Sequence, residues 1–120
     1  MYSPLDISTL MEGAWGHGPL DNDGASDWKL EMGKAIANDI KSKLTGDDYN
    51  YKYYAIGMWK FIKERLETNY GFFTEDITQE MDSLVVATAR RILSNPNKLM
   101  NTFKRPDIVK AHLELAAHVD

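Results

Sequence analysis

Three carboxylates recur at four-residue intervals near the start of the chain, at Asp23, Asp27 and Glu31. On an α-helix this spacing places them along one ridge. Carboxylate oxygens are the ligands that hard divalent cations such as Mg²⁺ and Ca²⁺ prefer. The pattern therefore allows a metal-binding or metal-dependent hydrolytic site, whose ligands would be Asp21, Asp23, Asp27 and His17.

The segment "DNDGASD" at 21–27 does not fit the EF-hand, the commonest calcium loop. With Gly24 at loop position six, Pro19 falls at position one and Leu30 at position twelve, and neither supplies a carboxylate. A helical ridge leaves most coordination positions to water, so a cation would bind weakly. We therefore expect no metal or other cofactor, and predict that Asp23, Asp27 and Glu31 form an acidic surface that contacts a protein partner.

Four tyrosines cluster at positions 49, 51, 53 and 54. On a helix they point to more than one face, and tyrosine is enriched at protein interfaces. We expect Tyr51 and Tyr54 to pack at the rim of the bundle, and Tyr49 and Tyr53 to form an exposed contact patch. The sequence thus favours a small non-enzymatic interaction module that binds an unidentified protein through its acidic N-terminal surface and its tyrosines. A homo-oligomer is a further alternative.

A basic region spans residues 90–110. Its cations are Arg90, Arg91, Lys98, Lys104, Arg105 and Lys110, against one acid, Asp107. These cations could contact phosphates while Phe103 stacks on a base, so nucleic-acid binding is a second alternative. The net charge of −4 makes it the less favoured one.

Composition limits the remaining classes of protein. The 120 residues suffice for one domain with a real core, and 43% of them are hydrophobic. Cysteine is absent, which excludes disulfides and cysteine nucleophiles. The longest apolar runs are too short to cross a membrane, and the first ten residues do not resemble a secretory signal. We expect a cytoplasmic protein.

The elements that position these side chains are predicted to be helices. We expect a first helix from Asp21–Asp23 to Gly46, a second after "GDDYN" that closes at Gly71, and a third from its N-cap Thr74 to "SNPN". Two further helices begin at prolines and cover 96–103 and 106–118. The expected fold is an all-α, small single-domain bundle of four to five helices, comprising residues 11–120 after an N-terminal extension, 1–10.

Helical periodicity also predicts which side chains are buried. In the first helix Ala25, Trp28, Met32, Ile36, Ile40 and Leu44 recur every three or four residues and should form its inner face. In the second, Met58 and Trp59 are expected to face inward.

The first helix follows an irregular glycine-rich segment, "GAWGHGPLDNDGASDW" at 13–28. It resembles the N-terminal signature of a bacterial family catalogued as domain of unknown function 4259, Trp-Gly-x-Gly-Pro-x-Asp-Asn-Asp-x-Ala-x-Asp-Trp, although Leu20 replaces the usual aromatic residue. The resemblance implies an origin in a bacterium or a bacterial virus and brings no activity with it. We expect the block to be structural, with the glycines allowing a tight turn and the two tryptophans buried together. Its structural residues would be Trp15, Gly16, Gly18, Pro19, Asn22 and Trp28.

Overall fold

The computed structural model describes residues 16–67 and 71–119, and every regular element within these ranges is a helix. In chain order the elements are α2 (Asp23–Leu44), α3 (Tyr49–Ile62), the π-helical segment η1 (Lys63–Glu67), α5 (Glu75–Ser94), α6 (Asn97–Met100) and α7 (Pro106–Ala116). The prediction of a small all-α bundle is confirmed. Trp15 and the predicted extension 1–10 lie outside the described residues.

The helix ends follow the local signals. Asn22 is the N-cap of α2, and its side-chain oxygen accepts a hydrogen bond of 2.8 Å from the backbone N–H of Ala25. Thr74 caps α5 in the same way, accepting from the N–H of Ile77 at 3.3 Å. Gly71 adopts a left-handed φ of 63° shortly before α5, as expected for a chain reversal.

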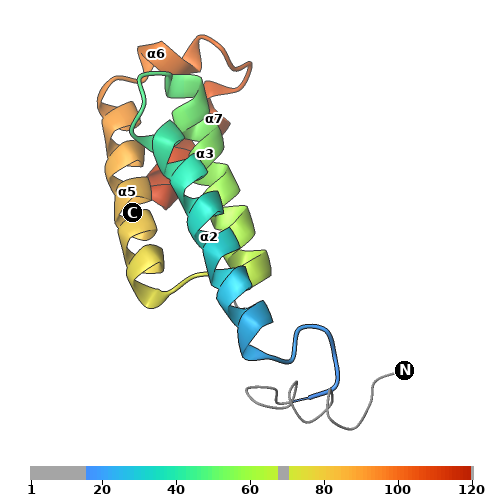
Figure 1. Cartoon of the computed structure of the whole chain (residues 1–120). Helices are drawn as coiled ribbons and strands as arrows, with labels where there is room; N and C mark the ends of the chain where they lie inside the picture. The colour runs from blue at the N-terminus through green and yellow to red at the C-terminus, as the bar shows by residue number, and fades with distance from the viewer. Residues whose placement is uncertain (1–15, 68–70, 120) are drawn as a thin grey trace, which may run out of the picture.

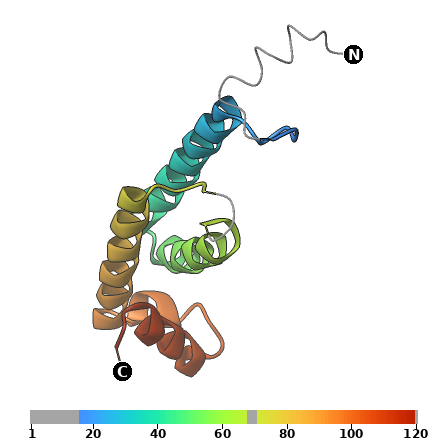
Figure 2. The same cartoon turned by 90° about the horizontal axis from the view of Figure 1, so that it is seen from below.

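Helices α2, α3 and α5 pack against one another, with the later half of α2 lying beside α3 and beside the first turns of α5 (Figure 1). The chain runs up α2, down α3 and up α5, so α3 is antiparallel to both neighbours. The short α6 covers one end, and α7 packs against α5 (Figure 2). The largest fully buried side chains between them are those of Leu44, Trp59, Met81, Ile92, Leu99 and Leu113.

The predicted inner face of α2 is wrong over its first turns. Trp28 is 58% exposed and Met32 is 37% exposed, whereas the buried residues are Gly33, Ala37, Ile40 and Leu44. A strict four-residue spacing advances about 40° around the helix at each step, so Trp28 and Met32 lie about 160° and 120° from Leu44 and away from the buried face. Figure 1 also shows that the start of α2 projects past the ends of α3 and α5. Met58 of α3 is likewise exposed, while the adjacent Trp59 is buried as predicted.

The connection between η1 and α5 crosses α2 at Gly33. A Cβ atom on Gly33 would lie 1.7 Å from the carbonyl oxygen of Phe72, so only glycine fits there. This close approach brings the neighbouring Phe73 into the core, where its ring meets the ring of Trp59 edge-on at 5.0 Å. Gly33 therefore determines how deeply the connection packs into the bundle.

Candidate protein-interaction surfaces

The glycine-rich segment forms a turn around the carboxylate of Asp21. Asp21 Oδ2 accepts a hydrogen bond of 2.9 Å from the N–H of Gly18, and the N–H of Asp21 donates to the Gly18 carbonyl at 3.1 Å. A Cβ on Gly16 or Gly18 would lie 2.8 or 2.6 Å from that same oxygen. The Asn22 side chain also donates to the carbonyl of Pro19 at 3.2 Å. The structure thus shows a tight turn leading into the N-cap, and the glycines provide the room that it needs.

This turn gives the metal hypothesis no support. The Asp21 carboxylate is engaged within the turn, and His17 is exposed. Across residues 16–67 and 71–119, no three acidic or histidine side chains are grouped closely enough to hold a metal ion.

The acidic ridge, Asp23, Asp27 and Glu31, lies on the projecting start of α2, and all three side chains are exposed. Asp23 is in the first turn, where its charge interacts favourably with the helix dipole. Trp28, expected to be buried, is exposed beside this ridge. The start of α2 therefore presents an aromatic ring next to carboxylates.

The tyrosines are exposed in the opposite pattern to the one predicted. Tyr49 and Tyr53 are partly buried, whereas Tyr51 and Tyr54 are each 50% exposed. The ring of Tyr53 packs edge-on against Phe103 at 5.3 Å, and its hydroxyl lies 3.2 Å from Nδ1 of His112 on α7. Burial raises the pKa of Tyr53. Helical spacing alone could not show that the 96–106 region covers Tyr49 and Tyr53.

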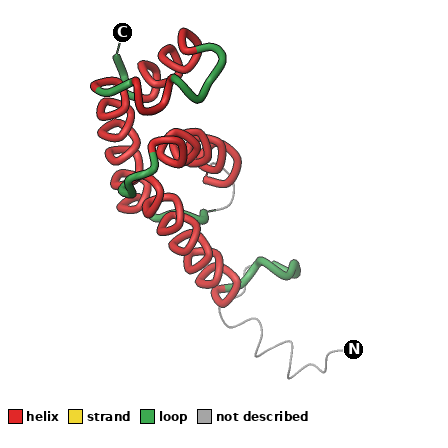
Figure 3. Tube along the Cα trace, turned by 90° about the horizontal axis from the view of Figure 1, so that it is seen from above, coloured by secondary structure: helices red, strands yellow, loops and turns green. Residues whose placement is uncertain are grey.

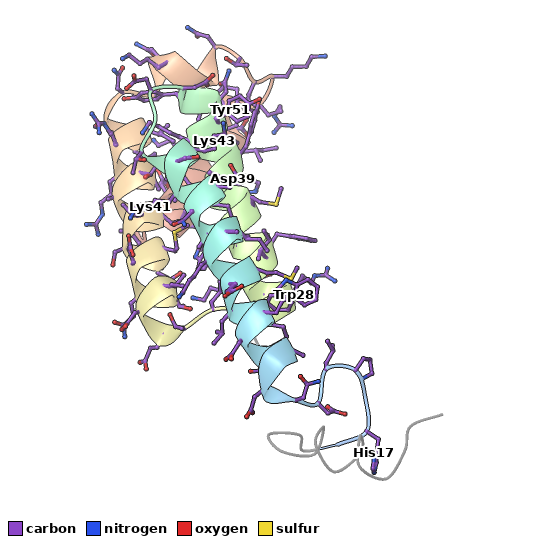
Figure 4. The ribbon with its side chains drawn as sticks, viewed as in Figure 1. His17, Trp28, Asp39, Lys41, Lys43 and Tyr51 are labelled. Atoms are coloured by element: carbon purple, nitrogen blue, oxygen red, sulfur yellow. The ribbon has the colours of Figure 1, made fainter. Side chains whose placement is uncertain are left out.

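The outer face of the α2–α3 pair carries exposed apolar side chains that we call the hairpin patch: Trp28, Met32, Tyr51, Tyr54, Met58 and Phe61. Between 37% and 58% of each residue is accessible. The members on α3 follow a spacing of three or four residues, and Lys43 of α2 lies 4.9 Å from the ring of Tyr51. Figure 4 shows Trp28, Asp39, Lys43 and Tyr51 along this side of the molecule. Exposed apolar side chains gathered on one side of a helix pair are a candidate interaction surface.

A groove separates α3 from α7. After the Tyr53–His112 contact the two helices are set apart, as Figure 3 shows, and two adjoining cavities of about 390 and 470 Å³ lie between them. Both cavities are lined by Ile56, Lys60, Leu115 and Ala116. Ile56 is buried and forms the floor, whereas Leu115 is 63% exposed on the rim. We call this the α3–α7 groove.

Polar contacts hold one wall of the groove in place. Asp82 of α5 accepts hydrogen bonds from Trp59 Nε1 at 2.9 Å and from Lys63 Nζ at 2.7 Å. Both nitrogens come from the α3–η1 segment, so Asp82 fixes α5 against α3 where the larger cavity opens. The α3 and α5 sides of the groove are therefore held together by these hydrogen bonds, whereas α7 forms the side that is set apart from α3.

The basic region predicted from the sequence is exposed, and Arg105 is paired with Asp107 at 2.9 Å. Lys98 lies 5.0 Å from the Tyr49 ring. Phe103, the residue expected to stack on a base, is partly buried against Tyr53. Only part of that ring is accessible to a base.

A buried lysine was not foreseen from the sequence. Lys52 is 3% exposed, and its ammonium group donates a 2.7 Å hydrogen bond to the carbonyl of Leu44 at the end of α2. Burial lowers the pKa of Lys52, and the positive charge of Arg91 lowers it further. Because its partner is a helix-terminal carbonyl, we assign Lys52 a structural role, joining the end of α2 to the start of α3.

Comparison with known protein families, with curated proteins and with solved structures yields no match to this chain. No helix in the described ranges is long and apolar enough to cross a membrane. The surfaces described above are therefore the basis for assigning a function.

Proposed function

We propose that this protein acts by binding another protein and that the α3–α7 groove is its principal binding site. The observation that carries this proposal is that α7 packs on α5 but stands away from α3, leaving an open apolar groove. Grooves between two helices commonly accept the apolar face of a third helix from a partner. We propose an amphipathic helix as the bound segment.

The groove has the features that such a helix requires. Its floor includes Ile56 and Ala116, and Tyr54 and Leu115 stand exposed along its edges. Gly57 lines the groove between Ile56 and Lys60, and a Cβ placed on it would meet nothing within 4 Å. The glycine leaves space for a side chain of the partner to enter.

The acidic ridge supplies a second element of the proposal. Asp23, Asp27 and Glu31 lie on the projecting start of α2, away from the groove. Exposed charge affects the rate and specificity of association more than its final affinity. We propose that this ridge attracts a partner with basic residues, so the association rate should fall as salt concentration rises.

The experiment fills the groove without disturbing the fold. Gly57→Leu places an apolar side chain in open space, and Leu115→Ser removes apolar surface from the rim. Leu20→Ser is the matched control, because Leu20 is 50% exposed and precedes α2. Tagged wild-type protein and each variant are used to capture proteins from a lysate of the source organism, with identification by mass spectrometry.

We expect one protein to be retained by the wild type and by Leu20→Ser, and lost with both groove variants while their circular dichroism spectra stay helical. Retention of the same proteins by all four chains would refute the groove as the binding site.

A further inference from the structure

We infer that the hairpin patch is a self-association surface, on which a second copy of this chain packs antiparallel to the first. The hairpin patch shares Tyr54 with the edge of the α3–α7 groove, whereas its other five members do not line either groove cavity. The inference rests on the area of the patch, on the register of α2 against α3 and on the distribution of charge.

The exposed area is of the size that a small dimer needs. Aromatic side chains bury about 150–250 Å² each, so Trp28, Tyr51, Tyr54 and Phe61, each 50–58% exposed, leave on the order of 400 Å² accessible. Stable interfaces use about 800 Å² from each partner. Met32 and Met58, together with the surface between them and the aromatic rings, supply much of the remainder. Two copies facing each other would therefore form an interface at the lower end of the stable range.

The register follows from one contact. Lys43 lies on the ring of Tyr51, so these positions are level on the two antiparallel helices. The patch thus extends along α2 from Trp28 to Lys43, a distance of about 22 Å at 1.5 Å per residue. Its centre is close to Ala35, a small and exposed residue. A two-fold axis at Ala35 places Trp28 of each copy beside Lys43 of the other, where a cation–π contact can form.

The charges favour the antiparallel orientation. The end of the molecule where α2 and α5 begin and α3 ends carries exposed acids, partly offset by the exposed cations Lys34, Lys60 and Arg65: Asp23, Asp27, Glu31, Glu64, Glu75 and Asp76. The opposite end carries exposed cations, partly offset by Asp47 and Asp48: Arg90, Arg91, Lys98 and Lys104. An antiparallel pair brings each acidic end beside a basic end, whereas a parallel pair would bring like charges together.

The first test is the mass of the particle in solution. We expect the full chain to change from monomer to dimer at micromolar concentrations by sedimentation equilibrium. Trp28→Ser and Phe61→Ser should each shift the midpoint at least tenfold toward monomer. Leu115→Ser is the control, because Leu115 is 63% exposed but belongs to the groove, so it should leave the midpoint unchanged.

The second test determines the relative orientation of the two copies by disulfide cross-linking. Because the sequence contains no cysteine, each introduced cysteine can cross-link only to its counterpart in the other copy. Ala35→Cys should cross-link to itself under mild oxidation, because the two-fold axis brings the two copies of residue 35 together. Lys43→Cys should not, because its two copies would be about 22 Å apart. Ala87→Cys, on an exposed position of α5, reports random collisions.

A chain that stays monomeric throughout the micromolar range refutes the inference. So does a dimer that Trp28→Ser leaves intact, or one in which Lys43→Cys cross-links as efficiently as Ala35→Cys. None of these results contradicts the groove proposal, because that proposal is tested separately, by partner capture with Gly57→Leu and Leu115→Ser. Conversely, loss of the groove partner leaves the dimer test unaffected.

Discussion

The close approach of two segments at Gly33 predicts that Gly33→Ala destabilises the protein, whereas the same substitution at Gly57 stabilises it. In Gly33→Ala, the new methyl group would start 1.7 Å from the carbonyl oxygen of Phe72. Real contacts of this type are not shorter than 3.0 Å, so the backbone of the connection must move by at least 3.0 − 1.7 = 1.3 Å. That movement would pull Phe73 away from Trp59.

The magnitude follows from two opposing effects. Alanine is favoured over glycine inside a helix by about 1 kcal/mol. Overpacking of a well-packed interior costs about 1–3 kcal/mol and occasionally more, and here the obstacle is backbone, which cannot rotate away. Because the displaced segment also carries the buried Phe73, we expect the larger costs to apply. The predicted net effect is a destabilisation of about 1–3 kcal/mol.

Gly57→Ala is the matched control. Gly57 is also inside a helix and a Cβ there meets nothing within 4 Å, so this change should stabilise the protein by about 0.5–1 kcal/mol. The assay is urea unfolding followed by circular dichroism, with the free energy of unfolding compared at equal slopes. If Gly33→Ala proves as stabilising as Gly57→Ala, the connection does not cross α2 as described.

Three further predictions follow from individual contacts. Asn22→Ala removes the N-cap of α2 and should lower the free energy of unfolding by about 1 kcal/mol in the same urea assay, whereas an unchanged value would mean that the cap does not form. Asp82→Ala leaves Trp59 Nε1 without its acceptor and should cost about 1–3 kcal/mol, which thermal unfolding would detect, while Asp82→Asn should cost less because its amide oxygen can still accept that bond. Burial raises the pKa of Tyr53, so the folded state keeps this proton above pH 10 and loses stability as the pH rises from 10.0 toward the raised value. Ultraviolet titration should show one late-ionising tyrosine that is missing in Tyr53→Phe, and a spectrum unchanged by that substitution would contradict the prediction.

Local sequence signals predicted the helices well because they depend on neighbouring residues. The Asn22 and Thr74 caps, the proline at the start of α7 and the left-handed Gly71 each act within a few residues of their position. The starts of these helices could therefore be found without knowledge of the rest of the fold. The ends were predicted less well: the second helix was expected to close at Gly71, whereas α3 ends at Ile62 and is followed by η1, and the helix expected over 96–103 is the shorter α6, Asn97–Met100.

The exposed surfaces depend on how helices are placed, which no local pattern contains. Trp28 has the four-residue spacing expected of a core residue, but this spacing drifts around α2 and leaves Trp28 on a face turned away from the buried Ala37, Ile40 and Leu44. Tyr49 and Tyr53 have the spacing of exposed residues but are covered by side chains far away in the sequence, including Lys98 and Phe103. The groove was not predicted, because it is formed by a separation between α3 and α7.

The extension of α2 past the bundle divides one continuous helix into two parts of different local stability. Its buried residues begin at Gly33, so the turns from Asp23 onward can unwind while the core stays intact. Amide protons in those first turns should exchange with solvent at rates set by local fraying, and those near Ile40 at rates set by global unfolding. Any protein that covers the start of α2 would slow exchange there selectively. Exchange at these few amides therefore reports directly on whether the start of α2 is covered.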